Sequence, residues 1–396
     1  MRKEGAGMAQ HNFSTKWILF VFMIGTFSVG MTEYVVTGLL TQFAKSLNVE
    51  VSTTGLLLSA YAIGVAVFGP ILRMATIKFP SRPLLVGLMA IFVVSNIIAA
   101  TAPNFEVLLM SRLLSATMHA PFFGLCMSIA VHISPPYRRT RAIAAVQGGL
   151  TIAVMLGVPF GSYLGGIFNW RSVFWFMAVL GLITLVGLLV VAPNIKSTVA
   201  PQLKKELHIF KNKHVLLIIA IIVFGYSGVF TAYTFMEPMI RTFAGFDVMG
   251  VTITLFCFGL GGVIGNFVSG KVEEAQLTKK LMLTFGLLAI VLVSFTFLLQ
   301  VSVLAFVISF LFGAGTFGTT PLLNSKIILT AIEAPMLSGT IAAAVFNVAN
   351  FLGATFGTFL LNQHFTYAMI TFVAAGVIVF GLMLTIVTYR VEIKAV

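Results

Sequence analysis

Long apolar runs alternate with short polar turns along almost the whole chain. Many of these runs approach or exceed the roughly 20 residues that an α-helix needs to cross a bilayer. They are continuous, unlike the alternating segments of a membrane β-barrel. The pattern therefore predicts an all-α integral membrane protein with twelve transmembrane helices, at about residues 17–43, 52–74, 84–102, 105–131, 142–167, 172–192, 215–243, 250–268, 281–299, 302–329, 336–361 and 367–388.

Composition agrees with this pattern and excludes a water-soluble protein. Hydrophobic residues make up 59% of the 396 and charged residues only 9%, whereas a soluble domain carries roughly a quarter charged residues. A short polar lead precedes the first apolar run, which is too long for the core of a signal peptide, so we expect no cleavable signal. Cys126 and Cys257 lie in apolar runs and imply neither a disulfide framework nor a metal site.

The net charge of +13 could indicate a nucleic-acid partner, but the positions of the charges explain it differently. If the amino terminus is cytoplasmic, all but four of the 24 Lys and Arg residues fall in cytoplasmic turns or at the termini. Lys45, Arg171 and Arg241 are then outside, and Arg112 lies within a helix. Cytoplasmic loops carry an excess of Lys and Arg. We therefore expect both termini in the cytoplasm, an inner (cytoplasmic) membrane location and no nucleic-acid partner.

A central polar stretch divides the chain into two halves of six predicted helices. We expect an N-terminal half at 1–192, a cytoplasmic loop at 193–214 and a C-terminal half at 215–396. Residues 156–164 match residues 352–360 at five of nine positions. The fifth and eleventh helices that carry these segments run in the same direction, as parallel repeats about an axis normal to the membrane require.

Glu33 is the lone acid well inside the first predicted helix, and an acid in hydrocarbon is a functional candidate by default. Arg112 and His119 are seven residues apart in the fourth helix and share one face. At the helical rise, Glu33 lies about 24 Å from the cytoplasmic start of its helix and Arg112 about 10 Å from the outer start. The similar depths predict a proton-coupling group of Glu33, Arg112 and His119. The alternatives are a permanent salt bridge that never titrates and a packed histidine.

Two further sets of residues are candidates for a substrate cavity and for conformational change. Polar and aromatic side chains that share helix faces predict a cavity lined by Tyr34, Gln147, Thr151, Tyr226, Phe230, Tyr233, Asn347 and Asn350. Packing is the alternative for this set. Small residues allow helices to approach closely, and proline loosens a helix. We therefore expect gating movements at Gly157, Pro159, Gly161, Gly353 and Gly357. Glu237, before Pro238, is expected near the membrane interface.

Four segments resemble the major facilitator superfamily, and within it the drug:proton antiporters of the arabinose-efflux-permease-like subset. They are Thr32-Glu-Tyr-Val-Val-Thr-Gly-Leu-Leu40, Arg112 with His119-Ala-Pro-Phe-Phe-Gly124, Gly157-Val-Pro-Phe-Gly-Ser-Tyr-Leu-Gly165 and Asn169-Trp-Arg-Ser-Val-Phe-Trp175. The resemblance implies the twelve-helix major facilitator fold, and it assigns Arg112 to proton transfer. The loop after the second helix departs from the family pattern, because Arg73 stands where an Asp is usual.

Together these patterns predict a secondary transporter that exports a small organic compound (a drug, a sugar or a metabolite) by alternating access. We expect it to act as a monomer in the lipid bilayer, with protons as its second partner, the proton gradient as its energy source and no cofactor. A proton-independent or uptake carrier is the main alternative. A membrane enzyme or receptor is a weaker one, because no nucleophile–base pair, metal cluster or soluble domain is recognisable. The substrate and the direction of transport stay open.

Overall fold

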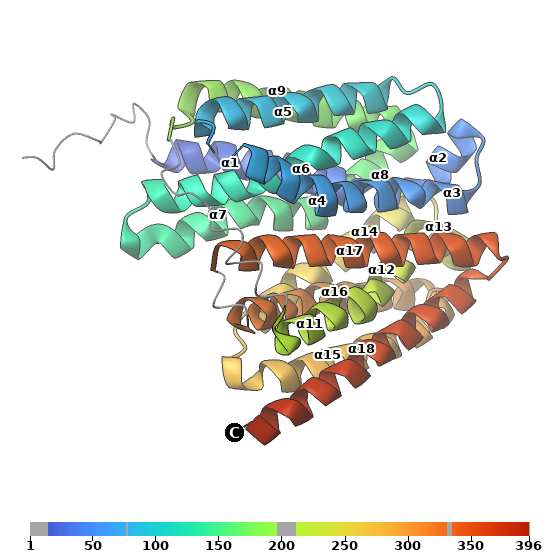
Figure 1. Cartoon of the computed structure of the whole chain (residues 1–396). Coiled ribbons are helices and arrows are strands. Elements are labelled where there is room, and N and C mark those ends of the chain that lie inside the picture. The colour runs from blue at the N-terminus through green and yellow to red at the C-terminus, as the bar shows by residue number, and fades with distance from the viewer. Residues whose placement is uncertain (1–14, 77, 196–210, 331–334, 396) are drawn as a thin grey trace, which may run out of the picture.

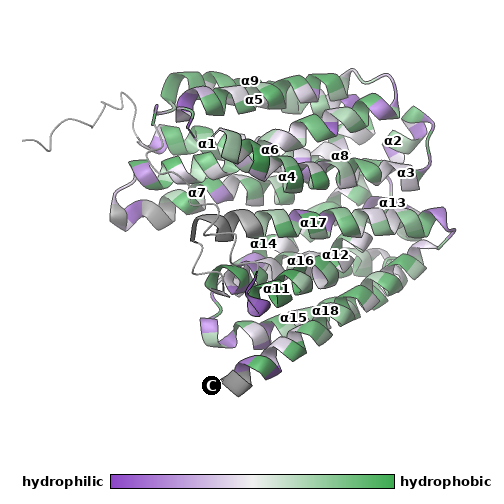
Figure 2. Ribbon diagram, in the orientation of Figure 1, coloured by the Kyte–Doolittle hydropathy of each residue, from purple (hydrophilic) through white to green (hydrophobic). Residues whose placement is uncertain are grey.

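The computed structural model describes residues 15–76, 78–195, 211–330 and 335–395, and within these ranges it is helical without β-strands. Twelve helical spans there are long and apolar enough to cross a membrane, which confirms the predicted fold class. Hydrophobic positions run along the helices, and hydrophilic ones gather mainly at the two ends of the molecule (Figure 2). This distribution suits a bilayer around the middle and water at both ends.

The first six spans form the N-terminal half. Its elements are α1 (Thr15–Tyr34), η1 (Val35–Gly38), α2 (Leu40–Leu47), α3 (Val51–Thr54), α4 (Leu56–Ala75), α5 (Ser81–Ala100), α6 (Phe105–Ile133), η2 (Pro136–Arg138), α7 (Arg139–Ile152), η3 (Ala153–Gly157), α8 (Val158–Ile167) and α9 (Trp170–Val191). Within this half α4 and α5 pack on α6, α5 packs on α9, and α1 packs on α7.

The last six spans form the C-terminal half. Its elements are α11 (Lys213–Ala220), η5 (Ile221–Tyr226), α12 (Ser227–Tyr233), α13 (Met236–Ala244), α14 (Val248–Ser269), η6 (Glu274–Gln276), α15 (Leu277–Leu298), α16 (Ser302–Thr330), α17 (Pro335–Asn362) and α18 (Tyr367–Ala395). Here α14 and α15 pack on α16, α15 packs on α18, and α12 packs on α17. The exact domain limits stay a prediction, because 196–210 of the central loop lies outside the described residues.

Several predicted helices are interrupted in the structure. The helix predicted at 17–43 becomes α1, η1 and α2, and the one predicted at 215–243 ends at Tyr233 and restarts at Met236. Pro238 explains the second break, because proline is accepted in the first turn of a helix but not in its interior. In the fifth span the π-helical turn η3 precedes Pro159. Proline has no backbone N–H, so one helical hydrogen bond is missing there.

The two halves lie one above the other in Figure 1. We call the end where α2, α3 and α13 lie the α2–α13 side, and the end where α18 finishes the C-terminal side (right and left in Figure 1). The halves meet where α4 packs on α17, where η3 and α8 pack on α14, and where α13 packs on α2 and η1. A large set of buried apolar side chains from both halves forms the core.

Side-chain hydrogen bonds between the halves concentrate toward the α2–α13 side. Thr37 Oγ1 lies 3.1 Å from the hydroxyl of Tyr233, and Thr355 Oγ1 donates to Ser59 Oγ at 3.1 Å. Thr41 donates to the Glu237 carboxylate through both its backbone N–H and its hydroxyl. In this arrangement the halves are therefore fastened together at one end of the molecule.

Candidate functional site

A cluster of buried polar side chains occupies the place where α1, α4 and α6 meet. Glu33 and Thr32 come from the last turn of α1, Arg112 and His119 from α6, and Tyr61 from α4. Relative exposure is 5% for Glu33, 1% for Arg112, 9% for His119 and 0% for Tyr61. Such groups are rare and costly inside a membrane-spanning bundle, so their concentration at one point makes this cluster the candidate functional site.

Within the cluster Glu33 lies next to His119. Glu33 Oε2 is 3.8 Å from His119 Nε2, and the other ring nitrogen of His119, Nδ1, is 2.9 Å from the hydroxyl of Tyr61. The predicted group of Glu33, Arg112 and His119 is thus brought together by two helices. Tyr61 is an additional member that the sequence pattern did not single out.

The similar depths of Glu33 and Arg112 suggested that these two side chains pair directly, but Arg112 has other partners in the structure. Its Nη1 donates to Thr32 Oγ1 at 3.1 Å, and its guanidinium carbon lies 4.3 Å from the centre of the Tyr61 ring. The side chain that lies 3.8 Å from the Glu33 carboxylate is instead that of His119, which is charged only when it is protonated. Arg112 Nε and Nη2 are buried without a hydrogen-bond partner among the described residues. Burying guanidinium N–H groups without acceptors is costly. These groups are therefore available to donate to a new partner in another conformation.

An aromatic contact joins this cluster to the C-terminal half. Tyr34 follows Glu33 directly, and its ring centre lies 6.4 Å from that of Tyr233 and 6.3 Å from that of Phe317. Tyr233 also stacks on Phe258 with ring centres 4.9 Å apart. Aromatic faces are suitable for binding sugars, nucleosides or apolar rings. The contact places such faces beside the carboxylate and between the halves.

The other predicted cavity residues of the C-terminal half lie in the seventh span, before Tyr233, and in α17. Tyr226 donates to the Thr316 carbonyl at 2.8 Å and contacts Phe230, with ring centres 5.8 Å apart. Asn350 is buried, and its Oδ1 has no hydrogen-bond partner within the described ranges. Asn347 donates to the Ala343 carbonyl. Both asparagines thus leave Oδ1 without a hydrogen-bond partner among the described residues, which favours a binding role for them.

Gln147 and Thr151, the predicted cavity residues of the fifth span, make no contact with the Glu33 cluster among the hydrogen bonds of the described residues. Gln147 is exposed, and the Thr151 hydroxyl donates to the Gln147 carbonyl within the same helix. No side-chain hydrogen bond between these two residues and the cluster is recorded in the described ranges. Their membership of a substrate site stays a prediction.

The predicted gating residues are positions of close helix packing within each half. Gly157 and Gly161 face Met31 and Val35, whereas Gly353 and Gly357 face the backbone of α12 at Ser227 and Thr231. Any larger side chain at Gly161 or Gly353 would collide with these neighbours. The same kind of contact therefore joins the fifth span to the first and the eleventh to the seventh, which is the relation expected of repeated halves. Pro159 begins α8 directly after the wide turn η3.

Glu237 was expected near the membrane interface, but the structure buries it between the halves. It is 0% exposed, forms an ion pair with Arg241 one turn later, and accepts hydrogen bonds from Thr41 N at 3.1 Å and Thr41 Oγ1 at 2.8 Å. Burial raises the pKa of Glu237, while Arg241 and Thr41 lower it. The spacing of four residues between Glu237 and Arg241 is the sequence signal for the ion pair.

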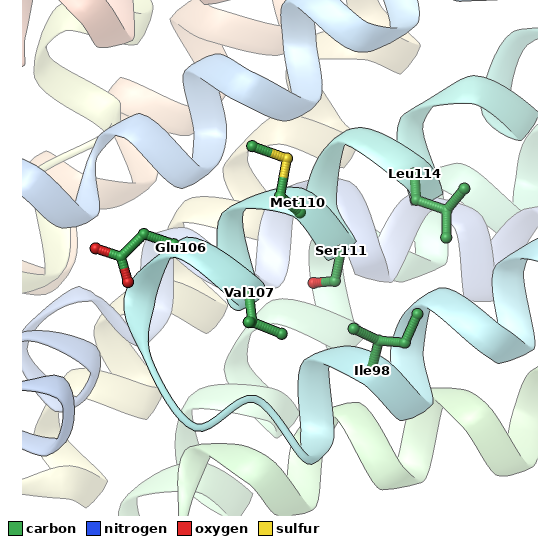
Figure 3. Close-up of a pocket in the computed structure, with 6 residues that line it drawn as sticks. All are labelled: Ile98, Glu106, Val107, Met110, Ser111 and Leu114. Carbon is green, nitrogen blue, oxygen red and sulfur yellow. The ribbon is translucent and has the colours of Figure 1, made fainter.

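Two grooves lie away from the polar cluster. A groove of about 260 Å³ on the outside of α5 and α6 is lined by Ile98, Glu106, Val107, Met110, Ser111 and Leu114 (Figure 3). A larger one of about 600 Å³ lies between the halves and is lined mainly by apolar residues of η3, α8 and α14, including Leu156, Phe160 and Phe256. Pro159 also lines it. Among the described residues no group of His, Cys, Asp and Glu is arranged to hold a metal ion.

Comparison with known proteins gives concordant matches. The sequence model of the Major Facilitator Superfamily matches residues 22–358. The chain is 45% identical to the uncharacterised MFS-type transporter YfhI of Bacillus subtilis, over 98% of both chains. It is 31% identical to a probable sugar efflux transporter of Helicobacter pylori (strain J99), over 87% of this chain and 88% of that one. The crystal structure of a bacterial Spinster homologue superposes with a TM-score of 0.73 at 14% identity, covering 97% of this chain and 98% of the other.

The twelve spans in two halves define a multi-pass membrane protein, and the family and relatives that it matches are transporters rather than enzymes. The chain belongs to the major facilitator superfamily.

Proposed function

We propose that this transporter couples the export of a small organic compound to the inward movement of protons. The observation that carries the proposal is the buried Glu33 in contact with His119, one residue from the aromatic contact between the halves. A carboxyl group in a membrane interior that has a titratable neighbour is suited to load and release a proton. The proton gradient then supplies the energy, and no cofactor is needed.

The orientation proposed is that of a bacterial inner-membrane protein with both termini in the cytoplasm. Lys271, Lys279, Lys280 and Lys326 lie in or beside turns at the C-terminal side, as the positive-inside rule requires of cytoplasmic turns. The hydrogen bonds between the halves lie toward the opposite, α2–α13 side. The described arrangement is accordingly the one that is closed to the outside.

In the proposed cycle Glu33 takes up a proton from the outside while the transporter faces outward. Neutralisation weakens its interaction with His119 and with the nearby Arg112, or with the bound substrate. The halves then close at the α2–α13 side, and the proton leaves Glu33 to the cytoplasm. A new substrate molecule binds beside the carboxylate, between Tyr34 and the aromatic residues of the C-terminal half. The protein works as a monomer.

The name of the Helicobacter pylori relatives supports sugars as the first compounds to test. The aromatic surroundings of Tyr34 are equally compatible with nucleosides and apolar drugs, since stacking on a ring face does not require a charged substrate. A thermal-shift screen of the purified transporter would start with pentoses, hexoses, nucleosides and lipophilic dyes.

The proposal is tested in proteoliposomes with a radiolabelled compound selected by that screen. Glu33→Gln is expected to abolish accumulation driven by a pH gradient while leaving substrate exchange at equal pH measurable, because only the coupling proton is removed. Glu106→Gln, at an exposed acid at the start of α6, serves as the matched control. Undiminished proton-driven transport by Glu33→Gln would remove Glu33 from the mechanism and favour a proton-independent carrier.

A further inference from the structure

Tyr61 is the side chain that contacts both α6 members of the cluster. Its hydroxyl lies 2.9 Å from Nδ1 of His119, and its ring centre lies 4.3 Å from the guanidinium carbon of Arg112. The ring is also 5.8 Å from the His119 ring, edge to face. One fully buried tyrosine of α4 thus holds two cationic or titratable groups that are seven residues apart on α6.

The chemistry of the three groups favours one direction for the hydrogen bond between Tyr61 and His119. An ionised carboxylate only accepts hydrogen bonds, so the ring nitrogen of His119 that faces Glu33 is best protonated. A neutral imidazole then has a bare Nδ1, which must accept. The Tyr61 hydroxyl is the donor placed at that nitrogen.

We propose that Tyr61 is a positioning residue of this site, whose hydroxyl donates to Nδ1 of His119 and thereby directs the Nε2–H toward Glu33. The inference rests on the proposed function of Glu33 as the proton-carrying group. The titratable groups that face one another here are Glu33 and Tyr34 of α1, Tyr61 of α4 and Arg112 and His119 of α6, with Tyr233 of α12 across the interface. In this set Tyr61 orients the histidine, and its ring packs against the guanidinium of Arg112.

The position of Tyr61 also connects the cluster to the boundary between the halves. Two residues before it, Ser59 accepts a hydrogen bond from Thr355 of α17 at 3.1 Å. Three residues after it, Gly64 lies so close to α6 that an added Cβ would be 2.5 Å from the Cβ of Ala116. α4 thus contacts α17 of the C-terminal half on one face and packs closely on α6, which carries His119, on the other.

The packing of the Tyr61 ring does not explain why this residue carries a hydroxyl group. The ring of Tyr61 belongs to a small apolar group with Val65 and Ala116, separate from the main core. A phenylalanine would fill the same space and keep the face of the ring under Arg112. Tyr61→Phe therefore removes the hydrogen bond to His119 and leaves the packing, which separates the two roles.

The test uses the full chain labelled with ¹⁵N-histidine, in lipid nanodiscs at neutral pH, and reads the protonation of each ring nitrogen by magic-angle-spinning NMR. His119→Gln identifies the signals of His119 among the six histidines. In the wild-type protein we expect a protonated Nε2 and a bare Nδ1. Tyr61→Phe should shift the ratio of the two tautomers about tenfold toward protonated Nδ1, as the loss of one hydrogen bond implies. The matched control Tyr163→Phe should leave it unchanged.

A protonated Nδ1 in the wild-type protein would overturn the proposal without any variant. An unchanged tautomer ratio in Tyr61→Phe would overturn it as well. Because the measurement needs no substrate, it is independent of the Glu33→Gln transport assay. Tautomer control by Tyr61 together with undiminished transport by Glu33→Gln would refute the proposed function and leave the positioning role in place.

Discussion

The contact between Thr41 and Glu237 is predicted to hold the halves together at the α2–α13 side. Thr41→Val removes the hydroxyl that donates to Glu237 Oε2 at 2.8 Å and keeps the shape of the side chain. The backbone N–H of Thr41 still donates at 3.1 Å. The variant therefore deletes one of the two hydrogen bonds that cross from Thr41 of α2 to Glu237 of α13.

The size of the effect follows from the charge of the acceptor. A hydrogen bond to a charged group contributes about 1.5–3 kcal/mol, and about 1.4 kcal/mol changes an equilibrium tenfold. In the open arrangement both groups bind water, so we expect the lower end, about a tenfold rise in the ratio of open to closed molecules. From a starting ratio of about 1:99 the open fraction would reach about one molecule in ten.

The assay is double electron–electron resonance between spin labels at Lys45→Cys and Thr242→Cys, both exposed, in a background without Cys126 and Cys257. A longer distance between α2 and α13 reports opening. Thr41→Ser keeps the hydroxyl and should match the wild-type protein, and Glu50→Gln controls for the loss of an unrelated exposed acid. A Thr41→Val distance distribution identical to that of Thr41→Ser would refute the reasoning.

Two further predictions follow from the described contacts. Because burial raises the pKa of Glu237 above that of an exposed carboxyl, the closed arrangement binds its proton more tightly than the open one. The closed population should thus be favoured at low pH and fall as pH rises through that raised pKa. The same spin labels measure this fall, and Glu237→Gln should remove the part of it that comes from Glu237 and leave the part that comes from Glu33. Gly353→Ala would push a Cβ into the Ser227 carbonyl and the Phe230 side chain, so thermal unfolding in detergent should show a loss of about 1–3 kcal/mol. Gly376→Ala, with open space at its Cβ, should show no loss, and equal melting temperatures for the two variants would contradict the packing argument.

The fold could be predicted from the sequence because the run lengths and the helical hydrogen-bonding demand of the bilayer leave few alternatives. Glu33, Arg112 and His119 were recognisable for a related reason: each is a polar residue in an apolar run, and their spacing and depth follow from helix geometry. The break before α13 and the π-helical turn before Pro159 depend on the local chemistry of proline. The length of an apolar run gives no information about it.

Pairing within the site could not be predicted, because it depends on the relative rotation of helices distant in sequence. Depth alone put Glu33 beside Arg112, yet the Glu33 carboxylate lies 3.8 Å from His119, and Arg112 donates to Thr32, one residue before Glu33. Tyr61 is a single tyrosine in an apolar run, and tyrosines of that kind are common in packed helices. Its importance becomes visible only when α4 and α6 are placed together. The burial of Glu237 likewise depends on α2 of the other half.

The charged face of α6 has a consequence for how the protein is made. The span Phe105–Ile133 has a mean hydropathy of 1.4, the lowest of the twelve spans found in the described residues. A buried arginine opposes insertion of an isolated helix into lipid. The groups that compensate it, Thr32 and Tyr61, belong to spans that are synthesised earlier. We therefore expect α6 to insert more readily when α1 and α4 are already in the membrane, and a chain lacking α1 should insert its fourth span less efficiently.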